Sequence, residues 1–465
     1  MIRLLIKKEL TELVRTAKVT WLLAGLAALL GLALYNGYAY STTRSQFLRE
    51  SQRTTYQQFI SQGDKNPHLG AHFGFYAYKP TADLALVDNG LEDYTGNSFY
   101  LEPHQRGVVR FREVSDATGL RSFGFLNVGY FAQFILPLFI FLLTHGIFAK
   151  EWENGTIKMV LSTRVRARQL FAGKLLACGL LVLAVVAALA LGALALLLGQ
   201  SGAAGLGRLL PTYGCYVAGL LLYALLLTLV GVAVSLLARS SALALVVLAG
   251  FWLVGVFLVP RLASELSRQA HPAITSVAFD DQTFHDMEYG VGREGTKDHR
   301  RALLEARTLA QYGVKRLEDL PVFFIPITIE YFEETDGRVM DRAYTAIARN
   351  EARQNRLVLA SALLSPFLAF RDFSLHLTAT DMATHNDFAQ QAEAHRRRVG
   401  VIVDAFYQKN TVAGNTFWRT VPQFAYTAPG LGWRLGNAAA PLAILLGWLL
   451  AASGLAALAY RRLRA

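Results

Sequence analysis

The side chains that could do chemistry are few and lie far apart in this sequence. His68 and His72 are four residues apart, the spacing at which two metal ligands share one face of a helix. Pro67, Gly70 and Gly74 argue against a helix at this point. We therefore expect a solvated loop here rather than a metal site.

Two acidic stretches are the other candidates for binding a cation. His285-Asp-Met-Glu288 has the composition of an exposed polar turn. The run from Glu330 to Asp336 is followed by Arg338 and Arg342, which favours a salt-bridged surface over a cation site. Neither stretch predicts a bound metal.

The motifs of common enzymes are absent from the sequence. Gly173-Lys174 lacks the upstream glycine and the following hydroxyl residue of a phosphate-binding loop, and no His-Glu-x-x-His or Gly-x-Ser-x-Gly motif occurs. The two cysteines, Cys178 and Cys215, both lie in apolar runs, so they form no disulfide framework. We expect no catalytic residues, and no cofactor or metal bound by this chain. An enzyme built on the polar segments stays a remote alternative.

Apolar residues dominate the elements that must position any site. The chain is 53% hydrophobic and only 17% charged, which is more apolar than a soluble protein of 465 residues. The surplus is concentrated in runs of about 20 residues, the length that crosses about 30 Å of hydrocarbon as a helix. Six transmembrane helices are predicted, at residues 19–40, 126–149, 171–199, 212–237, 242–260 and 437–459.

The net charge of +12 is located beside the apolar runs. Residues 41–125 and 261–436 carry balanced charges, whereas the short segments that flank the spans are strongly basic. This partition is the positive-inside pattern of a membrane protein, and it argues against nucleic acid as a partner. It places both termini and the 150–170 loop in the cytoplasm of a bacterium, with the spans in the inner membrane.

The first eighteen residues have an amphipathic pattern. Ile2, Leu5, Ile6, Leu10 and Leu13 fall on one helical stripe, opposite a basic face. Residues 1–18 are therefore predicted to form an interfacial helix on the cytoplasmic surface, as an uncleaved anchor rather than a signal peptide. Residues 460–465 are the cytoplasmic tail.

Two long polar segments, 41–125 and 261–436, leave the same membrane face and are predicted to fold together. The first is rich in turn residues and aromatics, which indicates loops and short strands. In the second, helices are expected at 296–320, at 338–364 up to Pro366, and at 381–406 with Thr380 or Asp381 as the cap. The predicted fold class is an all-α polytopic membrane protein with a large, mainly helical extracytoplasmic domain built from two insertions.

The 150–170 loop carries the most specific pattern in the chain. It contains Glu151 and Glu153, Gly155-Thr156, Leu161-Ser162, a basic turn at Arg164, and Gly173-Lys174 at the start of the next span. In this order, these features resemble the corresponding loop of ABC-2 type transporter permeases. Val165 departs from that pattern, because a proline or small residue often precedes the basic turn there. The 261–436 segment resembles the ectodomain of a large-ectodomain branch of the same family.

The resemblance implies that this loop is the coupling helix that fits into a cleft of a separate ATPase. The implied coupling residues are Glu151, Trp152, Glu153, Gly155, Thr156, Ile157 and Arg164. Trp152, Ile157 and Val160 would provide apolar anchors, and Gly155 would allow a sharp bend. An ordinary juxtamembrane helix is the structural alternative.

The resemblance also implies the function and the partners. The chain would be the permease subunit of an exporter-like ABC transporter. A partner ATPase would bind ATP and Mg²⁺, and a second permease, identical or a sister subunit, would complete the pathway. The alternative is a mechanotransmitting subunit, whose ectodomain acts on a periplasmic protein while no cargo passes through the spans.

Overall fold

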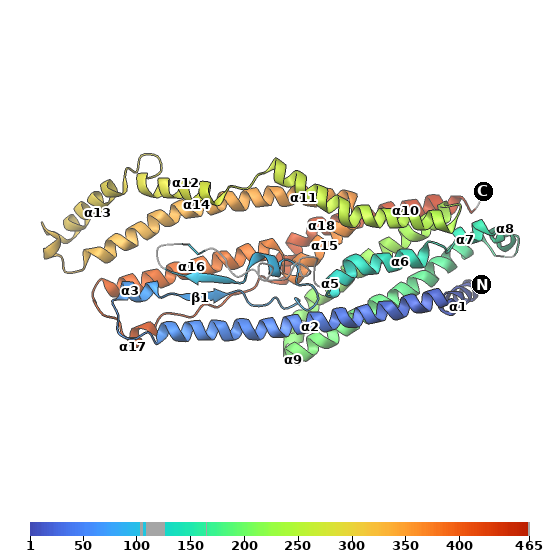
Figure 1. Cartoon of the computed structure of the whole chain (residues 1–465), viewed down its shortest axis with the longest axis horizontal. Helices are drawn as coiled ribbons and strands as arrows, with labels where there is room; N and C mark the ends of the chain where they lie inside the picture. The colour runs from blue at the N-terminus through green and yellow to red at the C-terminus, as the bar shows by residue number, and fades with distance from the viewer. Residues whose placement is uncertain (103–105, 108–125, 164, 464–465) are drawn as a thin grey trace.

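The computed structural model describes residues 1–465 except 103–105, 108–125, 164 and 464–465. Within this part, six helical stretches are long and apolar enough to cross a membrane. They are Val19–Ile60, Val128–Glu153, Ala167–Gly202, Gly207–Leu237, Ser241–Ala270 and Leu431–Arg461. Each overlaps one predicted span, which confirms the all-α polytopic class. Figure 1 shows the spans bundled at one end of an elongated molecule, with the larger domain at the other.

The elements of the membrane bundle are mostly helices interrupted by short irregular turns. The structure has α1 Ile2–Arg15, α2 Ala17–Ile60, α5 Val128–Tyr130, the π-helical η3 Phe131–Ile135, α6 Leu136–Thr144, α7 Ala149–Glu153, α8 Thr156–Leu161, α9 Ala167–Leu237, α10 Ser241–Leu253, the π-helical η4 Val254–Leu258, α11 Val259–Ala270 and α18 Leu431–Arg461. Helix α9 contains two spans, because Gly202 (φ 63°, ψ 176°) turns the chain back between them.

Two spans form the centre of the bundle. The apolar windows of Val128–Glu153 and Gly207–Leu237 are each 67% buried within the chain, against 11–28% for the other four. These two central spans lie very close together: a Cβ on Gly231 would come within 2.0 Å of the Thr144 hydroxyl oxygen. Only a glycine permits that approach.

The larger domain contains the remaining elements. These are α3 Pro67–His72, β1 Phe75–Tyr78, α4 Glu92–Thr95, β2 Ser98–Leu101, α12 Ser276–Tyr289, α13 Lys297–Tyr312, the 3₁₀ turn η5 Leu317–Asp319, α14 Phe324–Ser361, the 3₁₀ turn η6 Ala362–Leu364, α15 Pro366–Thr378, α16 Met382–Tyr407 and α17 Asn415–Trp418. Strands β1 and β2 form a two-stranded antiparallel sheet in which Phe75 pairs with Leu101.

Both polar segments contribute to one core in this domain. Phe59 and Phe75 from the first segment are buried together with Phe388 and Trp418 from the second. The rings of Phe59 and Trp418 lie 5.6 Å apart, and the Tyr56 hydroxyl donates to the Val421 carbonyl at 2.7 Å. The prediction that the two segments fold together is therefore confirmed.

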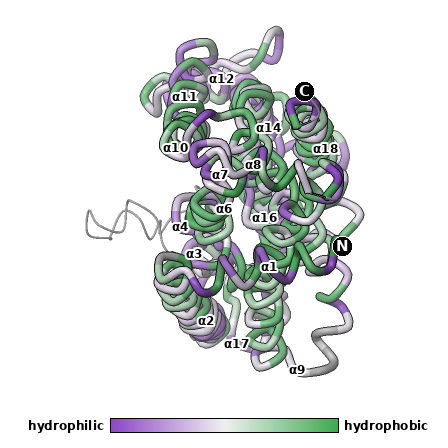
Figure 2. The backbone as a smooth tube through the Cα atoms, turned by 90° about the vertical axis from the view of Figure 1, so that its right-hand side faces the viewer, coloured by the Kyte–Doolittle hydropathy of each residue, from purple (hydrophilic) through white to green (hydrophobic). Residues whose placement is uncertain are grey.

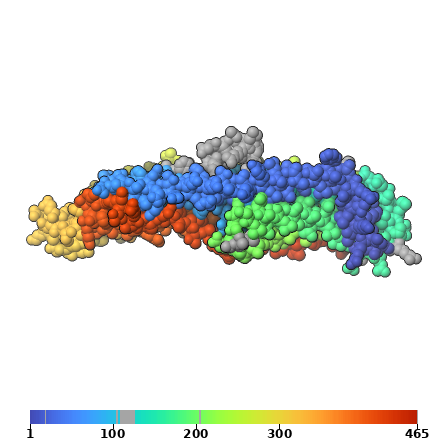
Figure 3. Space-filling model, turned by 90° about the horizontal axis from the view of Figure 1, so that it is seen from below, coloured from blue at the N-terminus to red at the C-terminus, as the bar shows by residue number. Residues whose placement is uncertain are grey.

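The prediction of loops and short strands for 41–125 is wrong for its beginning. Helix α2 continues past the expected end of the first span to Ile60, and Figure 3 shows it running along much of the molecule. Residues 41–60 contain neither glycine nor proline, so nothing in the sequence ends the helix there. The predicted short strands are present as β1 and β2.

The expected helices of the second segment are present with shifted ends. Helix α13 stops at Gly313, whose φ of 66° ends it, rather than near residue 320. Helix α14 begins at Phe324 and therefore includes the acidic run, where Arg338 pairs with Glu334 at 3.1 Å as expected of a salt-bridged face. Asp381 caps α16, accepting from the Thr384 amide at 2.9 Å, which confirms one of the two predicted caps.

Helix α15 packs against the spans, although it belongs to the predicted extracytoplasmic segment. Phe370 stacks on Tyr223 of α9 with ring centroids 4.3 Å apart. Ser365 caps α15 and also donates to the Gly255 carbonyl of η4 at 2.7 Å. Pro366, which we expected only to end a helix, also starts this one, since proline is well tolerated in a first turn.

The histidine pair His68 and His72 and the single His285 all lie on helices, which corrects the sequence prediction. His68 and His72 belong to α3, because Asn66 caps its amino terminus and Pro67 suits the first helical position. Their Nε2 atoms are 3.3 Å apart. His285 lies on α12 and is exposed, so the predicted turn is wrong but the exposure is right. No cluster of three or more potential metal ligands occurs among the described residues.

Asp404 on α16 is buried against α14. The residue is 4% exposed, and its Oδ2 atom has no hydrogen-bond partner among the described residues. Burial, with smaller repulsion from Glu333 and Glu330, raises the pKa of Asp404 to about 8. The folded protein therefore holds this proton more tightly than the unfolded chain does.

Stability should depend on pH through this carboxyl group. The protonated Asp404 contributes fully to the free energy of unfolding below about pH 4, and this contribution is lost as the pH rises through about 8. Asp404→Asn should raise the unfolding temperature by a few degrees at pH 8.5 and change it little at pH 4.5, measured by tryptophan fluorescence in detergent. Glu334→Gln, at an exposed position on α14, is the control. Equal effects of Asp404→Asn at both pH values would contradict the assignment.

Candidate coupling loop

The segment between the second and third spans forms two short helices joined by a tight turn. Helix α7 ends at Glu153, and α8 begins at Thr156. Between them Gly155 has a φ of 69°, a left-handed conformation that residues with a Cβ rarely adopt. The predicted bend at Gly155 is therefore present. Figure 2 looks at the end of the molecule where α1, α7, α8 and both chain termini lie.

A buried lysine joins this segment to the rest of the bundle. Lys174 Nζ lies 2.9 Å from Glu9 Oε1 on α1 and 2.9 Å from Glu151 Oε1 on α7. The lysine side chain is 3% exposed, and those of Glu9 and Glu151 are 4% and 18% exposed. One cation thus holds together the amino-terminal helix, the loop and the third span. We call Glu9, Glu151 and Lys174 the lysine cluster.

Close packing of α1 on α9 makes the lysine cluster possible. A Cβ on Gly173 would come within 2.9 Å of Leu5 Cβ, so a larger residue there would push α1 away. Glu9 falls on the apolar stripe of α1, which faces α9. The apolar stripe of α1 therefore packs against the bundle at this point. The amphipathic pattern alone predicted only that α1 lies at the membrane surface.

The loop is attached to the fifth and sixth spans as well. A carboxylate oxygen of Glu153 accepts from the Ser241 backbone amide and hydroxyl at 3.0 Å each, at the start of α10. The guanidinium of Arg462, directly after α18, lies 5.6 Å from the centre of the Trp152 ring. Glu153 and Trp152 were predicted to be coupling residues. In the structure, each contacts another part of its own chain.

The outer face of α8 is where the loop is open to solvent. Ile157 is fully buried in the core of the chain, so its side chain is not available to a partner. Met159 is 70% exposed, which makes it the large apolar side chain that the loop presents outward. Thr156 is exposed and donates to the Glu151 carbonyl at 3.4 Å. Arg164 lies outside the described residues.

Sequence reasoning placed Lys174 in the family motif but not among the coupling residues, and it missed Met159. A signal for the first was available: Glu9 interrupts an apolar stripe, and a buried carboxylate needs a cation. Residues 150–164 alternate apolar and polar types too irregularly to show which apolar side chain of α8 faces outward. Only the packing of α8 on the bundle separates Ile157 from Met159.

Two family models match parts of the chain. Residues 107–256, which include the loop, three whole spans and part of a fourth, match the family described as ABC-2 family transporter protein. Residues 277–427 match a domain of unknown function, DUF3526. No curated protein matches the chain.

Proposed function

This chain belongs, through residues 107–256, with the ABC-2 transporter permeases, and from that premise we propose that it couples ATP hydrolysis by a separate subunit to export. In this proposal the ATPase binds α7 and α8 from the cytoplasmic side. The predicted coupling residues then divide into two groups. Thr156 and Met159 meet the partner, whereas Glu151, Trp152, Glu153 and Ile157 hold the loop rigid, and Gly155 sets its bend.

The observation that supports the proposal best is the bracing of the loop. Direct contacts to α9, to α10 and to Arg462 directly after α18, together with the link through Lys174 to α1, fix a short element that has an exposed tip. Force applied at that tip would reach four helices at once, because packed interiors transmit displacement with little compression. An ordinary juxtamembrane helix needs no such set of attachments.

The proposal is tested by assembly and activity together. The chain and its candidate ABC ATPase would be purified as a complex and returned to inner-membrane lipid. We expect the chain to retain the ATPase through affinity purification and to change its rate of ATP hydrolysis at least severalfold. An ATPase that neither binds nor changes its rate would contradict coupling.

A second permease is part of the same proposal, and one exposed stripe suggests where it would bind. Val254, Leu258, Leu262 and Leu266 follow each other at intervals of four and are 43–63% exposed. Leu266 lies about 38 Å from Ser241 along the helix axis, beyond about 30 Å of hydrocarbon, so lipid tails do not explain its exposure. The side of α11 that faces its own chain carries the small residues Ala263 and Ser267.

A cysteine at this stripe should therefore link two chains. Leu266→Cys is expected to give a disulfide-linked dimer under mild oxidation in native membranes, as read by non-reducing electrophoresis. Val277→Cys, at a position that is 76% exposed but off the stripe, is the matched control and should stay monomeric. A monomeric Leu266→Cys chain, or equal linking of both variants, would argue against this interface.

Mechanotransmission remains the second candidate, and one feature favours it. Helix α2 passes from the first span into the larger domain without interruption over 44 residues. A rigid helix of this kind can carry motion from the membrane to the far domain, and from there to a periplasmic protein. ATP-dependent movement of the far domain in a chain whose spans admit no cargo would favour this alternative over export.

A further inference from the structure

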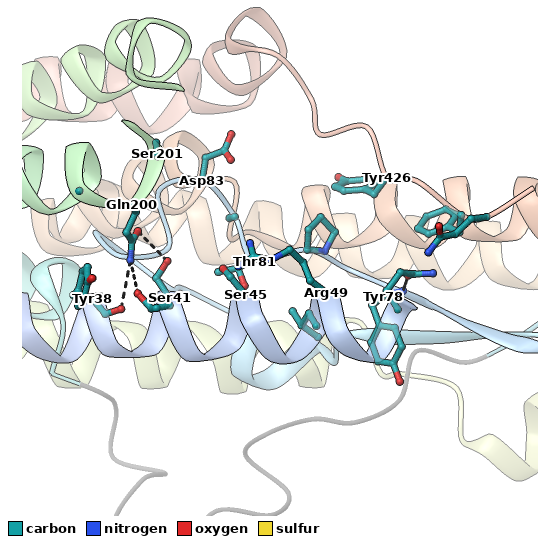
Figure 4. A pocket seen from close by; sticks show the side chains of 18 residues that line it. Tyr38, Ser41, Ser45, Arg49, Tyr78, Thr81, Asp83, Gln200, Ser201 and Tyr426 are labelled. Carbon is teal, nitrogen blue, oxygen red and sulfur yellow. Dashed lines mark hydrogen bonds between the residues drawn. The ribbon is translucent and has the colours of Figure 1, made fainter. Parts of the chain in front are cut away.

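A cavity of about 760 Å³ lies where the larger domain meets the outer ends of the spans. Its walls come from α2, from the loop after β1, from the turn at Gly202, and from the segment before α18. Figure 4 shows the side chains that line it. The volume is that of a site for a small ligand or a lipid headgroup.

Helix α2 shows where the end of the cavity nearest the spans lies relative to the bilayer. We call this end the floor of the cavity. About 20 residues after Val19, the length that crosses the hydrocarbon, the helix reaches Tyr38, which lines the cavity. Tyr35 and Tyr38 are 68% and 37% exposed, and tyrosines at that height are typical of the headgroup layer. The cavity therefore begins at headgroup level and rises from it.

The lining near that floor is made of hydroxyl and amide groups. Gln200, at the end of the third span, donates to Thr42 Oγ1 at 2.9 Å and to the Tyr38 carbonyl at 3.4 Å. The Ser41 hydroxyl donates to the side-chain oxygen of Gln200 at 3.4 Å. These bonds close the cavity on the side of the third span and give it a polar wall where lipid headgroups lie.

The charged residues among the described lining are one of each sign, Arg49 and Asp83. Figure 4 shows Arg49 rising from α2 toward Thr81, with Asp83 farther along the same loop, beside Gln200 and Ser201. Arg49 makes no ion pair with any described residue, so its guanidinium is free to bind an anion. Tyr78 and Tyr426 complete the upper wall.

We propose that this cavity binds the zwitterionic headgroup of a phospholipid, of the phosphatidylethanolamine class. The phosphate would accept charge-assisted hydrogen bonds from Arg49, and the ammonium would donate to Asp83. A headgroup that carries both charges can bind both side chains, whereas a purely anionic or cationic headgroup can bind only one of them. This inference goes beyond the proposed coupling function and does not depend on it.

Native mass spectrometry of the chain, released from nanodiscs, tests the proposal. The nanodiscs would contain equal mole fractions of phosphatidylethanolamine and phosphatidylglycerol with the same acyl chains. The unaltered chain should retain the first lipid preferentially. Arg49→Ala and Asp83→Asn should each lower its retention about tenfold, the loss of one charge-assisted bond. Arg53→Ala, one turn along α2 and outside the cavity, should have no effect.

Several results would overturn the proposal. Equal retention of the two lipids by the unaltered chain would do so. Lower lipid retention in Arg49→Ala but not in Asp83→Asn would also do so, because the cavity would then recognise only an anion. Binding of soluble phosphoethanolamine as tightly as the lipid, although it has no acyl chains, would mean a site for a soluble ligand. Circular dichroism of each variant checks the fold. Since no ATPase is present, failure here leaves the coupling proposal intact.

Discussion

Met159→Asp is expected to abolish assembly with the ATPase while leaving the permease folded. The side chain is 70% exposed, so an aspartate there costs the folded chain little. In a docked complex the same change would remove an apolar anchor and bury a charge, which is worth about 2 kcal/mol or more. The affinity for the ATPase, measured by titration in detergent, should fall at least about 30-fold.

Ile157 supplies the matched control for this prediction. It lies two residues away but is fully buried, so Ile157→Ala should lower stability by about 2–5 kcal/mol. The two variants should therefore show opposite patterns: Met159→Asp loses affinity at unchanged unfolding temperature, and Ile157→Ala loses unfolding temperature. Unchanged affinity in Met159→Asp would remove α8 from the interface.

Lys174→Met is expected to damage both stability and coupling. Removing the cation leaves Glu9, which is buried, with only the half-exposed Lys8 at 3.7 Å as a counter-charge, and it leaves the partly buried Glu151 without its lysine, at a cost of about 3–5 kcal/mol. Helix α1 and helix α7 would lose their common attachment to α9. Thermal unfolding should occur at a clearly lower temperature, and stimulation of the ATPase should be lost even where the variant still binds it.

Two further variants separate the lysine cluster from a general effect of charge. Lys158→Met removes an exposed lysine from the same loop and should leave the unfolding temperature unchanged. Adding Glu9→Gln and Glu151→Gln to Lys174→Met removes the uncompensated charges and should restore much of the lost stability. A triple variant no more stable than Lys174→Met would show that the ion pairs are not the cause.

The membrane part of the fold could be predicted from sequence because one physical requirement dominates it. A span needs about 20 apolar residues, so each of the six was found. The same reasoning could not find the end of α2, since residues 41–60 are polar enough for solvent and still lack a helix breaker. It also could not show that α15 packs against the spans, because apolar helices of soluble cores have the same composition.

The coupling loop was found through its resemblance to a family, and its internal arrangement was not. The bend at Gly155 followed from residue type, because only glycine adopts a left-handed φ without cost. The roles of the charges did not follow: Glu151 was expected to face a basic partner, and in the structure it binds Lys174. That contact joins residues 23 positions apart in sequence, and Glu9 joins it from 165 positions away. The apolar stripe of α1 indicates that Glu9 needs a cation, but no local pattern indicates which one.

The central claim is that the loop faces the cytosol, where an ATPase can reach it. Ser162→Cys, at an exposed position after α8, tests this claim. Cys215 is replaced by alanine so that it does not react, and Cys178 can stay because it is buried. A membrane-impermeant maleimide would be added to intact spheroplasts, with Val277→Cys on the far domain as the reference. The account predicts that Val277→Cys is labelled at once and Ser162→Cys only after the inner membrane is opened. Labelling of Ser162→Cys in intact spheroplasts would contradict it.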